Sequence, residues 1–360
     1  MKLKICLIAT TALCASSSAF ATDLPQVSNP LSYVEACDAQ GKGYFKIPGS
    51  STCLKLGGYV RTLITSQNLL EDYGVTTAAT ITEEEERNDY SFYTRFLMHL
   101  TTMTETELAT IETYAEFYTT WDNSGENDWS TGILYSNIDF GGLALHLGYD
   151  TSLFEPFTGY TGHYNEVAVG YAETWQARAT LDLGNSAAIA LGVESSEYAG
   201  GATGGIDFTG ALTFDLQPLS LGTMAIAHAY DEDNYGYGVT GYVTLKPTDR
   251  LSFGVGGTYG VNTLDYLTYT YDDDISNGDL SGWNVFGGVE YKLTDTIKTA
   301  VDAGYTALEV DGEAYDIMGV NAGVVYNPVK GLTFLAEGGY LTDSRDNDTL
   351  NVVGRVQYSF

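Results

Sequence analysis

From Leu54 to Phe360, nearly every apolar segment alternates apolar and polar residues with a period of two. Successive side chains of a β-strand point to opposite faces, so this alternation predicts strands with one apolar and one polar side. No amphipathic helix pattern and no apolar run of about 18 residues interrupts it. The pattern predicts sixteen strands, at residues 53–66, 89–102, 107–119, 130–140, 142–150, 174–183, 187–198, 206–217, 221–231, 235–246, 251–262, 282–293, 297–308, 314–327, 332–342 and 349–360.

The connections between these strands alternate in length. The short connections carry turn residues and lie at 104–106, 141, 184–186, 218–220, 247–249, 294–296 and 328–331. The long ones are rich in acid and include 82–86, 122–128, 272–274 and 343–348. Short turns at one end and long polar loops at the other are typical of outer-membrane barrels. An even number of strands places both chain ends on the short-turn side.

One face of each predicted strand suits contact with hydrocarbon, and the other suits contact with water. In 174–183 and 349–360, apolar residues alternate with residues such as Gln176, Arg178 and Gln357. A soluble sandwich would also alternate, but strand lengths near ten, the strand number and the aromatic positions favour a barrel. Glycines within strands, as at 254–257, are expected to relieve crowding where the sheet bends or where barrels pack together.

Aromatic residues gather near strand ends on the apolar face. Trp175 and Trp283 lie towards the long loops, and the aromatic residues towards the short turns are Phe140, Phe214, Tyr291, Tyr358 and Phe360. We expect two belts at the membrane interfaces, the alternative being ordinary core aromatics. Because lipid tolerates no unpaired sheet edge, the sheet must close. The sequence therefore predicts an all-β, sixteen-stranded antiparallel transmembrane barrel, which is wide enough for an aqueous channel.

The first 21 residues predict an export signal. They contain two lysines, an apolar run at 5–13 and the small-residue pattern Ala19-Phe20-Ala21, after which we expect cleavage. The run is too short to span a bilayer. Cys6 and Cys14 would leave with this segment, and the remaining chain is expected in the bacterial outer membrane.

Composition narrows the possible partners. The chain has 47 acidic and 16 basic residues, and its formal charge is −31. Nucleic acid is excluded as a partner, because phosphate binding needs clustered Lys and Arg. A chain this acidic could be disordered, but 44% apolar residues, 28 Tyr and 14 Phe argue for a folded protein.

Cys37 and Cys53 are the only cysteines outside the export signal. An exported protein meets an oxidising compartment, so we expect a disulfide between them, the alternative being two reduced structural cysteines. Closing this short loop would stabilise the fold by about 3 kcal/mol. We expect residues 22–52 to form an N-terminal segment on the periplasmic side, fixed beside the first strand of a barrel at 53–360.

The residues around the cysteine pair resemble the N-terminal pattern of the alphaproteobacterial general porins. The segments that carry the resemblance are 33–39 (YVEACDA), 41–49 (GKGYFKIPG), 52–54 (TCL) and 57–61 (GGYVR). The resemblance implies a homotrimeric diffusion channel for small hydrophilic solutes and ions. Tyr358 and Phe360, with apolar residues at alternate positions before them, resemble the signal read by the outer-membrane assembly machinery.

The connection at 150–173 (DTSLFEPFTGYTGHYNEVAVGYAE) follows the fifth predicted strand. In porins the loop at this position folds into the lumen and narrows it. Its acids are Asp150, Glu155, Glu166 and Glu173, of which Glu155 and Glu166 are the favoured constriction carboxylates. The alternative makes 164–173 a further strand.

Four arginines fall on the polar face of predicted strands, namely Arg61, Arg95, Arg178 and Arg355. The resemblance implies a basic wall facing the acidic loop, which would create a transverse field. The alternative for each arginine is a pair with a lumen acid such as Glu112 or Glu116. The acid excess predicts cation preference, although charge beyond about 8 Å is screened at physiological salt.

Other functions have less support in the sequence. Divalent cations bridging the acidic loops to lipopolysaccharide are expected, but the stretch 272–279 offers only part of a calcium-loop pattern and is otherwise a solvated loop. We expect no metal site, no cofactor and no enzymatic activity, because His99 and His146 have lumen parity, His163 lies in the long connection, and the faces around His228 cannot be separated. The alternative function is a solute-specific channel or a surface adhesin on the same barrel.

Overall fold

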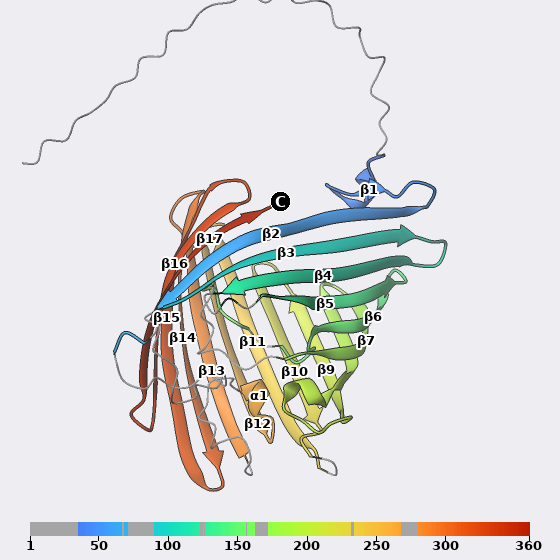
Figure 1. The fold of residues 1–360 in the computed structure, drawn as a ribbon. Helices are drawn as coiled ribbons and strands as arrows, with labels where there is room; N and C mark the ends of the chain where they lie inside the picture. Colours follow the sequence, from blue (N-terminus) through green and yellow to red (C-terminus); the bar gives the residue numbers. More distant parts are fainter. Residues whose placement is uncertain are drawn as a thin grey trace, which may run out of the picture.

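The computed structural model describes residues 35–66, 68–70, 90–122, 125, 127–155, 157–162, 172–231, 234–267 and 280–360, and these are almost entirely β-sheet (Figure 1). No helix among them is both long and apolar enough to cross a membrane. The short elements are η1 (Asp38–Gln40), β1 (Phe45–Lys46), η2 (Ser196–Ala199) and α1 (Leu264–Leu267). The sixteen long strands are β2 (Thr52–Ser66), β3 (Tyr90–Glu105), β4 (Thr110–Asp122), β5 (Asn127–Asp139), β6 (Leu143–Thr151), β7 (Glu173–Gly184), β8 (Ala187–Ser195), β9 (Ile206–Asp215), β10 (Leu219–His228), β11 (Gly236–Thr248), β12 (Leu251–Val261), β13 (Leu280–Lys292), β14 (Ile297–Val310), β15 (Glu313–Val329), β16 (Leu332–Asp343) and β17 (Asp348–Ser359).

The sheet closes on itself. Each strand from β2 to β17 pairs antiparallel with the next, and β17 also pairs with β2, from Val353 opposite Thr65 to Ser359 opposite Tyr59. Beyond the strand, the Phe360 amide donates to the Gly58 carbonyl at 3.0 Å, and the Gly58 amide donates to the Phe360 carbonyl at 3.2 Å. Closure satisfies the backbone groups that an open edge would expose to lipid. The predicted sixteen-stranded antiparallel barrel is confirmed.

The strand ends match the predicted ranges within three residues. The prediction of long connections is wrong at 122–128 and at 343–348. Only residues 123–126 separate β4 from β5, and only residues 344–347 separate β16 from β17. In the second turn, the Asp343 carboxylate accepts bonds from the Arg345 and Asn347 amides at 2.9 and 3.0 Å, so this acid closes a tight turn and is not part of a solvated loop.

The outer face of the barrel is apolar. Trp175 is 50% exposed, whereas its neighbour Gln176 points inwards and is 6% exposed. The aromatic residues predicted at the strand ends lie on this outer face, and those with large exposed areas are Phe140, Trp175, Trp283, Tyr291, Tyr358 and Phe360. This placement matches the belts that amphipathic rings form at membrane interfaces.

The inner face is less uniformly polar than predicted. Towards the long-loop side it carries Leu308, Ile317 and Leu341, which pack with Leu267 of α1. These residues are buried because α1 folds over the inside of the wall, packing on β12 and β13 (Figure 1). Apolar residues on the inner face therefore mark the places where other segments cover the wall.

Candidate functional site

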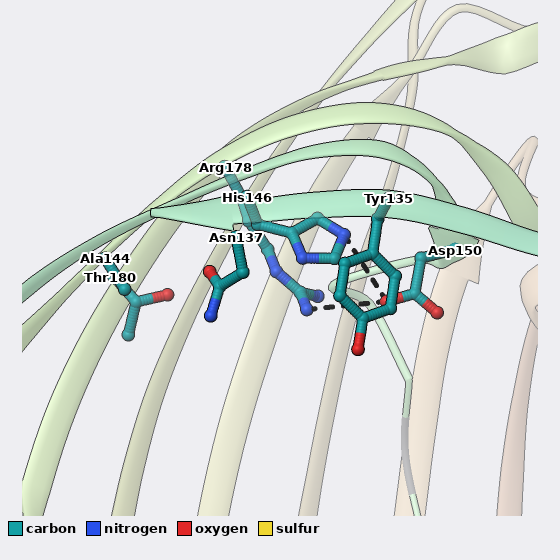
Figure 2. A pocket seen from close by; sticks show the side chains of 7 residues that line it. All are labelled: Tyr135, Asn137, Ala144, His146, Asp150, Arg178 and Thr180. Atoms are coloured by element: carbon teal, nitrogen blue, oxygen red, sulfur yellow. Dashed lines mark ion pairs between the residues drawn. The ribbon is translucent and has the colours of Figure 1, made fainter. Parts of the chain in front are cut away.

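β6 and β7 bring predicted constriction residues together at the point where the chain leaves the wall. Asp150 Oδ2 lies 3.7 Å from Arg178 Nη2 and 3.4 Å from His146 Nε2, and all three side chains converge on one cavity (Figure 2). Glu173 is next to them, because it pairs with Thr151 across the β6–β7 ladder. Arg178, predicted as part of a basic wall, thus stands among the predicted acids.

Glu155 belongs to the same acidic group. Water reaches its side chain, but protein atoms crowd around it and remove part of its hydration. This burial, followed by the negative charge of Asp150, raises the pKa of Glu155, while Arg178 opposes the shift. The fourth predicted acid, Glu166, and the alternative strand at 164–173 lie outside the described residues, apart from residues 172 and 173, of which Glu173 begins β7.

The other three predicted arginines gather on β17, β2 and β3. Arg61 is directly opposite Arg95, and Arg61 also pairs in register with Gln357, two residues from Arg355. The Arg61 guanidinium lies 4.5 Å from the Tyr59 ring centroid and donates to Gln357 Oε1 at 2.8 Å. These arginines therefore form a basic patch on the wall, defined as Arg61, Arg95 and Arg355.

Glu112 and Glu116 are the alternative partners predicted for these arginines, but both accept hydrogen bonds from tyrosines. Tyr114 Oη donates to Glu116 Oε2 at 3.1 Å, and Tyr135 Oη donates to Glu112 Oε1 at 3.3 Å. Arg95 Nε donates to Thr120 Oγ1 at 2.8 Å. Within the described part of the chain, the ion pair of a predicted arginine with a carboxylate is Arg178 with Asp150.

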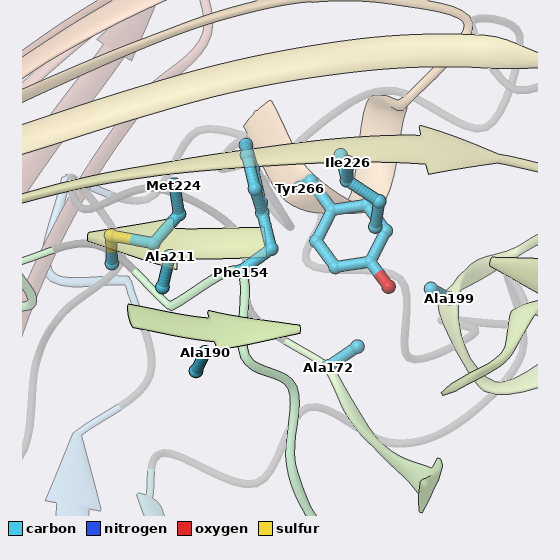
Figure 3. Packing of buried hydrophobic residues seen from close by; sticks show 8 residues of the cluster. All are labelled: Phe154, Ala172, Ala190, Ala199, Ala211, Met224, Ile226 and Tyr266. Atoms are coloured by element: carbon cyan, nitrogen blue, oxygen red, sulfur yellow. The ribbon is translucent and has the colours of Figure 1, made fainter. Parts of the chain in front are cut away.

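After β6 the chain turns into the barrel. We call the described residues 152–155 and 157–162 the inserted segment. Its Phe154 is fully buried and meets the Tyr266 ring edge-on at 5.4 Å, in a cluster with side chains from β8, β9 and β10 (Figure 3). The segment therefore lies against the inside of the wall and not over the rim.

Two sets of buried carboxylates fix the inserted segment. At its start, Glu194 of β8 accepts from Ser152 Oγ at 2.6 Å and from the Leu153 amide at 2.9 Å. At its far end, Asp302 of β14 accepts from the amides of Tyr160 and Thr161, the latter at 2.6 Å. These carboxylates replace water as partners of backbone amides inside the barrel.

The basic patch also touches the inserted segment. The Gly162 amide donates to Glu337 Oε2 of β16 at 2.7 Å, and Arg355 Nη1 donates to the Gly162 carbonyl at 3.0 Å. The segment thus begins at β6 and β8 and reaches β14, β16 and β17. Because these strands are far apart in the sheet order, the segment crosses the interior.

Wall glycines make room for the aromatic residues of the segment. A Cβ at Gly254 would overlap the Phe157 ring, and a Cβ at Gly238 would lie 3.0 Å from Phe154. Gly254 faces inwards on β12, so it does not lie at a contact between barrels, and its predicted role in sheet bending stays a prediction. Its role is to let an aromatic ring approach the backbone.

The anchoring residues Glu194, Asp302 and Glu337 were not singled out from the sequence. Each has inward parity in a predicted strand, as a water-facing acid would have, so the pattern alone did not distinguish them. His228, whose face the sequence left open, points inwards and contacts Asp207 Oδ2 at 2.7 Å. No cluster of metal-binding side chains occurs among the described residues.

The N-terminal segment is attached to the barrel as expected. Cys37 and Cys53 form a disulfide with a Cα–Cα distance of 6.2 Å. β1 pairs with β2, and Gln40 Nε2 donates to Glu105 Oε1 at 2.9 Å, beside the turn between β3 and β4. The described part of this segment therefore lies at the short-turn end. The predicted export signal at 1–21 lies outside the described residues.

Comparisons with known proteins agree with this geometry. A family model described as "Porin subfamily" matches residues 23–358. Porin Omp2b of Brucella suis is 31% identical over 369 residues, covering 94% of this chain and 92% of that protein. Two solved structures share the fold: the outer membrane channel DcaP of Acinetobacter baumannii (TM-score 0.68, 14% identity, 88% of this chain and 99% of that chain) and OmpT of Vibrio cholerae in its trimer form (TM-score 0.60, 11% identity, 86% and 100%).

The family and the barrel together settle the general class of function. Porins are channels rather than enzymes, and a closed barrel of sixteen strands is wide enough to conduct water and small solutes. The match extends over nearly the whole chain, and the identity to Omp2b is sufficient to show kinship. The chain therefore belongs to the alphaproteobacterial porin family, whose members form general diffusion channels in the outer membrane.

Proposed function

We propose that the channel is a passive, cation-preferring pore whose narrowest part lies between the connection 150–173 and the arginine-bearing wall. The observation that carries this proposal is the crossing of the lumen by the inserted segment, held at both ends by buried carboxylates. A segment fixed in this way narrows the pore without closing it, because the inner faces of β3 and β4 stay accessible to water.

Charge around the inserted segment supports the cation preference. Asp150, Glu155 and Glu173 gather near Arg178, whereas Arg61, Arg95 and Arg355 gather on β17, β2 and β3. Charges of opposite sign at the sides of a narrow pore produce a transverse field that orients polar solutes. Since the formal charge of the whole chain is −31, the field in the lumen favours cations. We retain Glu166 as a further constriction acid by its position in the sequence.

Reversal potentials in a planar bilayer with a KCl gradient test this proposal. We expect a reversal potential whose sign shows that potassium crosses the pore more readily than chloride. It should decrease in the double variant Asp150→Asn and Glu155→Gln and increase in Arg61→Gln with Arg95→Gln. Glu313→Gln, at the first residue of β15, is the matched control and should leave the potential unchanged. An anion-selective wild-type pore would contradict the proposal.

We also propose a homotrimer. OmpT, which shares the fold, has been solved in a trimer form. On the outer face of β2 to β4, threonine hydroxyls pair across strands, at 3.1 Å for Thr62 with Thr94 and 2.6 Å for Thr102 with Thr113. Such hydroxyls suit a surface covered by protein better than one facing hydrocarbon. Mass measurement of the detergent-solubilised protein tests this assembly.

Further partners follow from the chain ends and the loops. Tyr358 and Phe360 point outwards at the end of β17, where the assembly machinery would read them. The acidic stretches 82–86 and 272–274 lie outside the described residues, and by composition we propose that divalent cations link them to lipopolysaccharide. Residues 22–52 are proposed to remain on the periplasmic side, bound to the barrel through the disulfide.

A solute-specific channel is the second candidate, because the lumen wall carries an ordered set of aromatic and polar side chains. The stacking of Tyr114 on Tyr135, with ring centroids 5.5 Å apart, favours it over a surface adhesin.

A further inference from the structure

Four inward-pointing rings form a continuous stack on the open part of the wall, which we call the aromatic row: His99, Tyr114, Tyr135 and His146. They come from β3, β4, β5 and β6, and consecutive ring centroids are 5.5, 5.5 and 4.6 Å apart. The planes of the first three rings differ by 24° and 14°. The aromatic row is therefore a stiff lining of the lumen and not a set of independent side chains.

The tyrosines of the row are held in place at their hydroxyl ends. Each hydroxyl donates its proton to a carboxylate of β4, Tyr114 to Glu116 and Tyr135 to Glu112. The oxygen lone pairs then remain as acceptors on the lumen side. Fixed rings bind a solute without the entropic cost of ordering them first.

The aromatic row ends at a cavity of about 270 Å³, shown in Figure 2. Its polar lining consists of Tyr135, Asn137, His146, Asp150, Arg178 and Thr180. At about 30 Å³ for each water molecule, it holds about nine waters, which is room for one sugar ring. Asp150 is the penultimate residue of β6, so the cavity borders the start of the inserted segment.

The lining has unused hydrogen-bonding capacity. His146 is 5% exposed, and its Nε2 lies 3.4 Å from Asp150 Oδ2 without a hydrogen bond to any described residue. The contact with Asp150 fixes the imidazole in the wall of the cavity. Arg178 and Asn137 add planar groups that donate in several directions.

The charges in the cavity favour a neutral ligand. Arg178 and Asp150 carry opposite charges 3.7 Å apart and compensate each other. A charged solute would have to separate this pair, whereas a hydroxyl can accept from the guanidinium and donate to the carboxylate at once. Vicinal hydroxyls on a ring match such adjacent donors and acceptors.

We propose that this cavity is a binding subsite for neutral polyhydroxylated solutes of the size of one monosaccharide. The proposal rests on the proposed channel function, since solutes reach the cavity from the lumen. Binding at such a site is weak, because a channel conducts only if its solute can leave again. The aromatic row and its cavity thus give a general pore a preference among neutral solutes.

The test uses the full-length protein in planar bilayers, with D-glucose added to a KCl solution. We expect glucose to reduce the ion current saturably, and a polyethylene glycol of equal hydrodynamic radius to reduce it only in proportion to its concentration. The double variant Asn137→Ala with Thr180→Val should raise the half-blocking glucose concentration about ten-fold, the effect of losing one or two hydrogen bonds. Thr213→Val, which changes an inward-facing residue of β9 outside the cavity, is the control.

Calorimetric titration of the detergent-solubilised protein with glucose separates the two proposals. A wild-type pore that conducts ions but neither binds glucose nor shows saturable block overturns the subsite and leaves the channel intact. Equal glucose affinity in the wild type and the double variant overturns it as well. A protein that conducts no ions contradicts the channel proposal, and the titration then decides the subsite by itself.

Discussion

The inner wall of this barrel has two unlike halves. On β3 and β4 the inward side chains, such as Glu112 and Tyr114, are partly exposed and therefore accessible to water. On β13 and β14 the inward side chains Asn284, Asp302 and Thr306 are buried, because the inserted segment and α1 cover that side. The same alternation of residues thus produces a water-lined surface on one half and a docking surface on the other. The two halves differ because the inserted segment and α1 cover only one of them.

Replacing an inward-facing wall glycine with a larger residue should have the largest effect, because it displaces the inserted segment from the covered half of the wall. In Gly254→Val the new side chain overlaps Phe157, so the inserted segment must move into the lumen, at a cost of about 1–3 kcal/mol in packing. We expect a large fall in single-channel conductance with the barrel intact. Gly241→Val, on the outer face of β11 where a Cβ meets ordinary contacts, is the matched control. Equal conductance in both variants would show that Phe157 does not set the pore.

Removing the far anchors should make the covered half resemble the open half. Asp302→Ala with Glu337→Ala leaves the amides of Tyr160, Thr161 and Gly162 without their carboxylates. Each charge-assisted bond contributes about 1.5–3 kcal/mol, so we expect the segment to detach and the open-channel current to become noisy. Glu309→Ala, on the outer face of β14, should retain the quiet current of the wild type. A quiet double variant would mean that Glu194 and the aromatic contacts suffice.

A fall in pH should reduce the cation preference of the pore, and we expect this effect to be smaller than those of the two preceding variants. The raised pKa of Glu155 means that its carboxyl takes up a proton at a higher pH than an ordinary glutamate does. Cation preference should therefore decline as the pH falls from about 7 to 5, before most exposed carboxylates protonate. Reversal potentials measured over this range should change less in Glu155→Gln. An unchanged pH profile in that variant would assign the effect to other groups.

The smallest effect is expected at the short-turn end, which both halves share. Replacing Cys37 and Cys53 with serine removes about 3 kcal/mol from the attachment of the N-terminal segment and leaves the strand ladders unchanged. We expect faster proteolysis within residues 22–52, with unaltered conductance. Altered conductance would show that the segment reaches into the lumen path.

The strands were predictable because alternation and turn residues are local properties of the chain. Arg61 and Arg95 were placed on the lumen side from parity alone, and the structure brings them face to face. The anchors were not predictable, since Asp302 meets backbone amides that lie more than 140 residues away in sequence. One signal was present: the apolar residues Leu308, Ile317 and Leu341 at inward parity indicate a cover on the wall.

The inward-facing glycines Gly238 and Gly254 let single mutations narrow the constriction but not widen it. Glycine is the smallest residue, so every substitution at Gly238 or Gly254 adds volume behind an aromatic ring of the inserted segment. Mutation at these positions can push the ring towards the pore axis but never let it sink deeper. A lineage can therefore restrict the traffic through this pore in a single step, whereas enlarging the passage requires changes elsewhere.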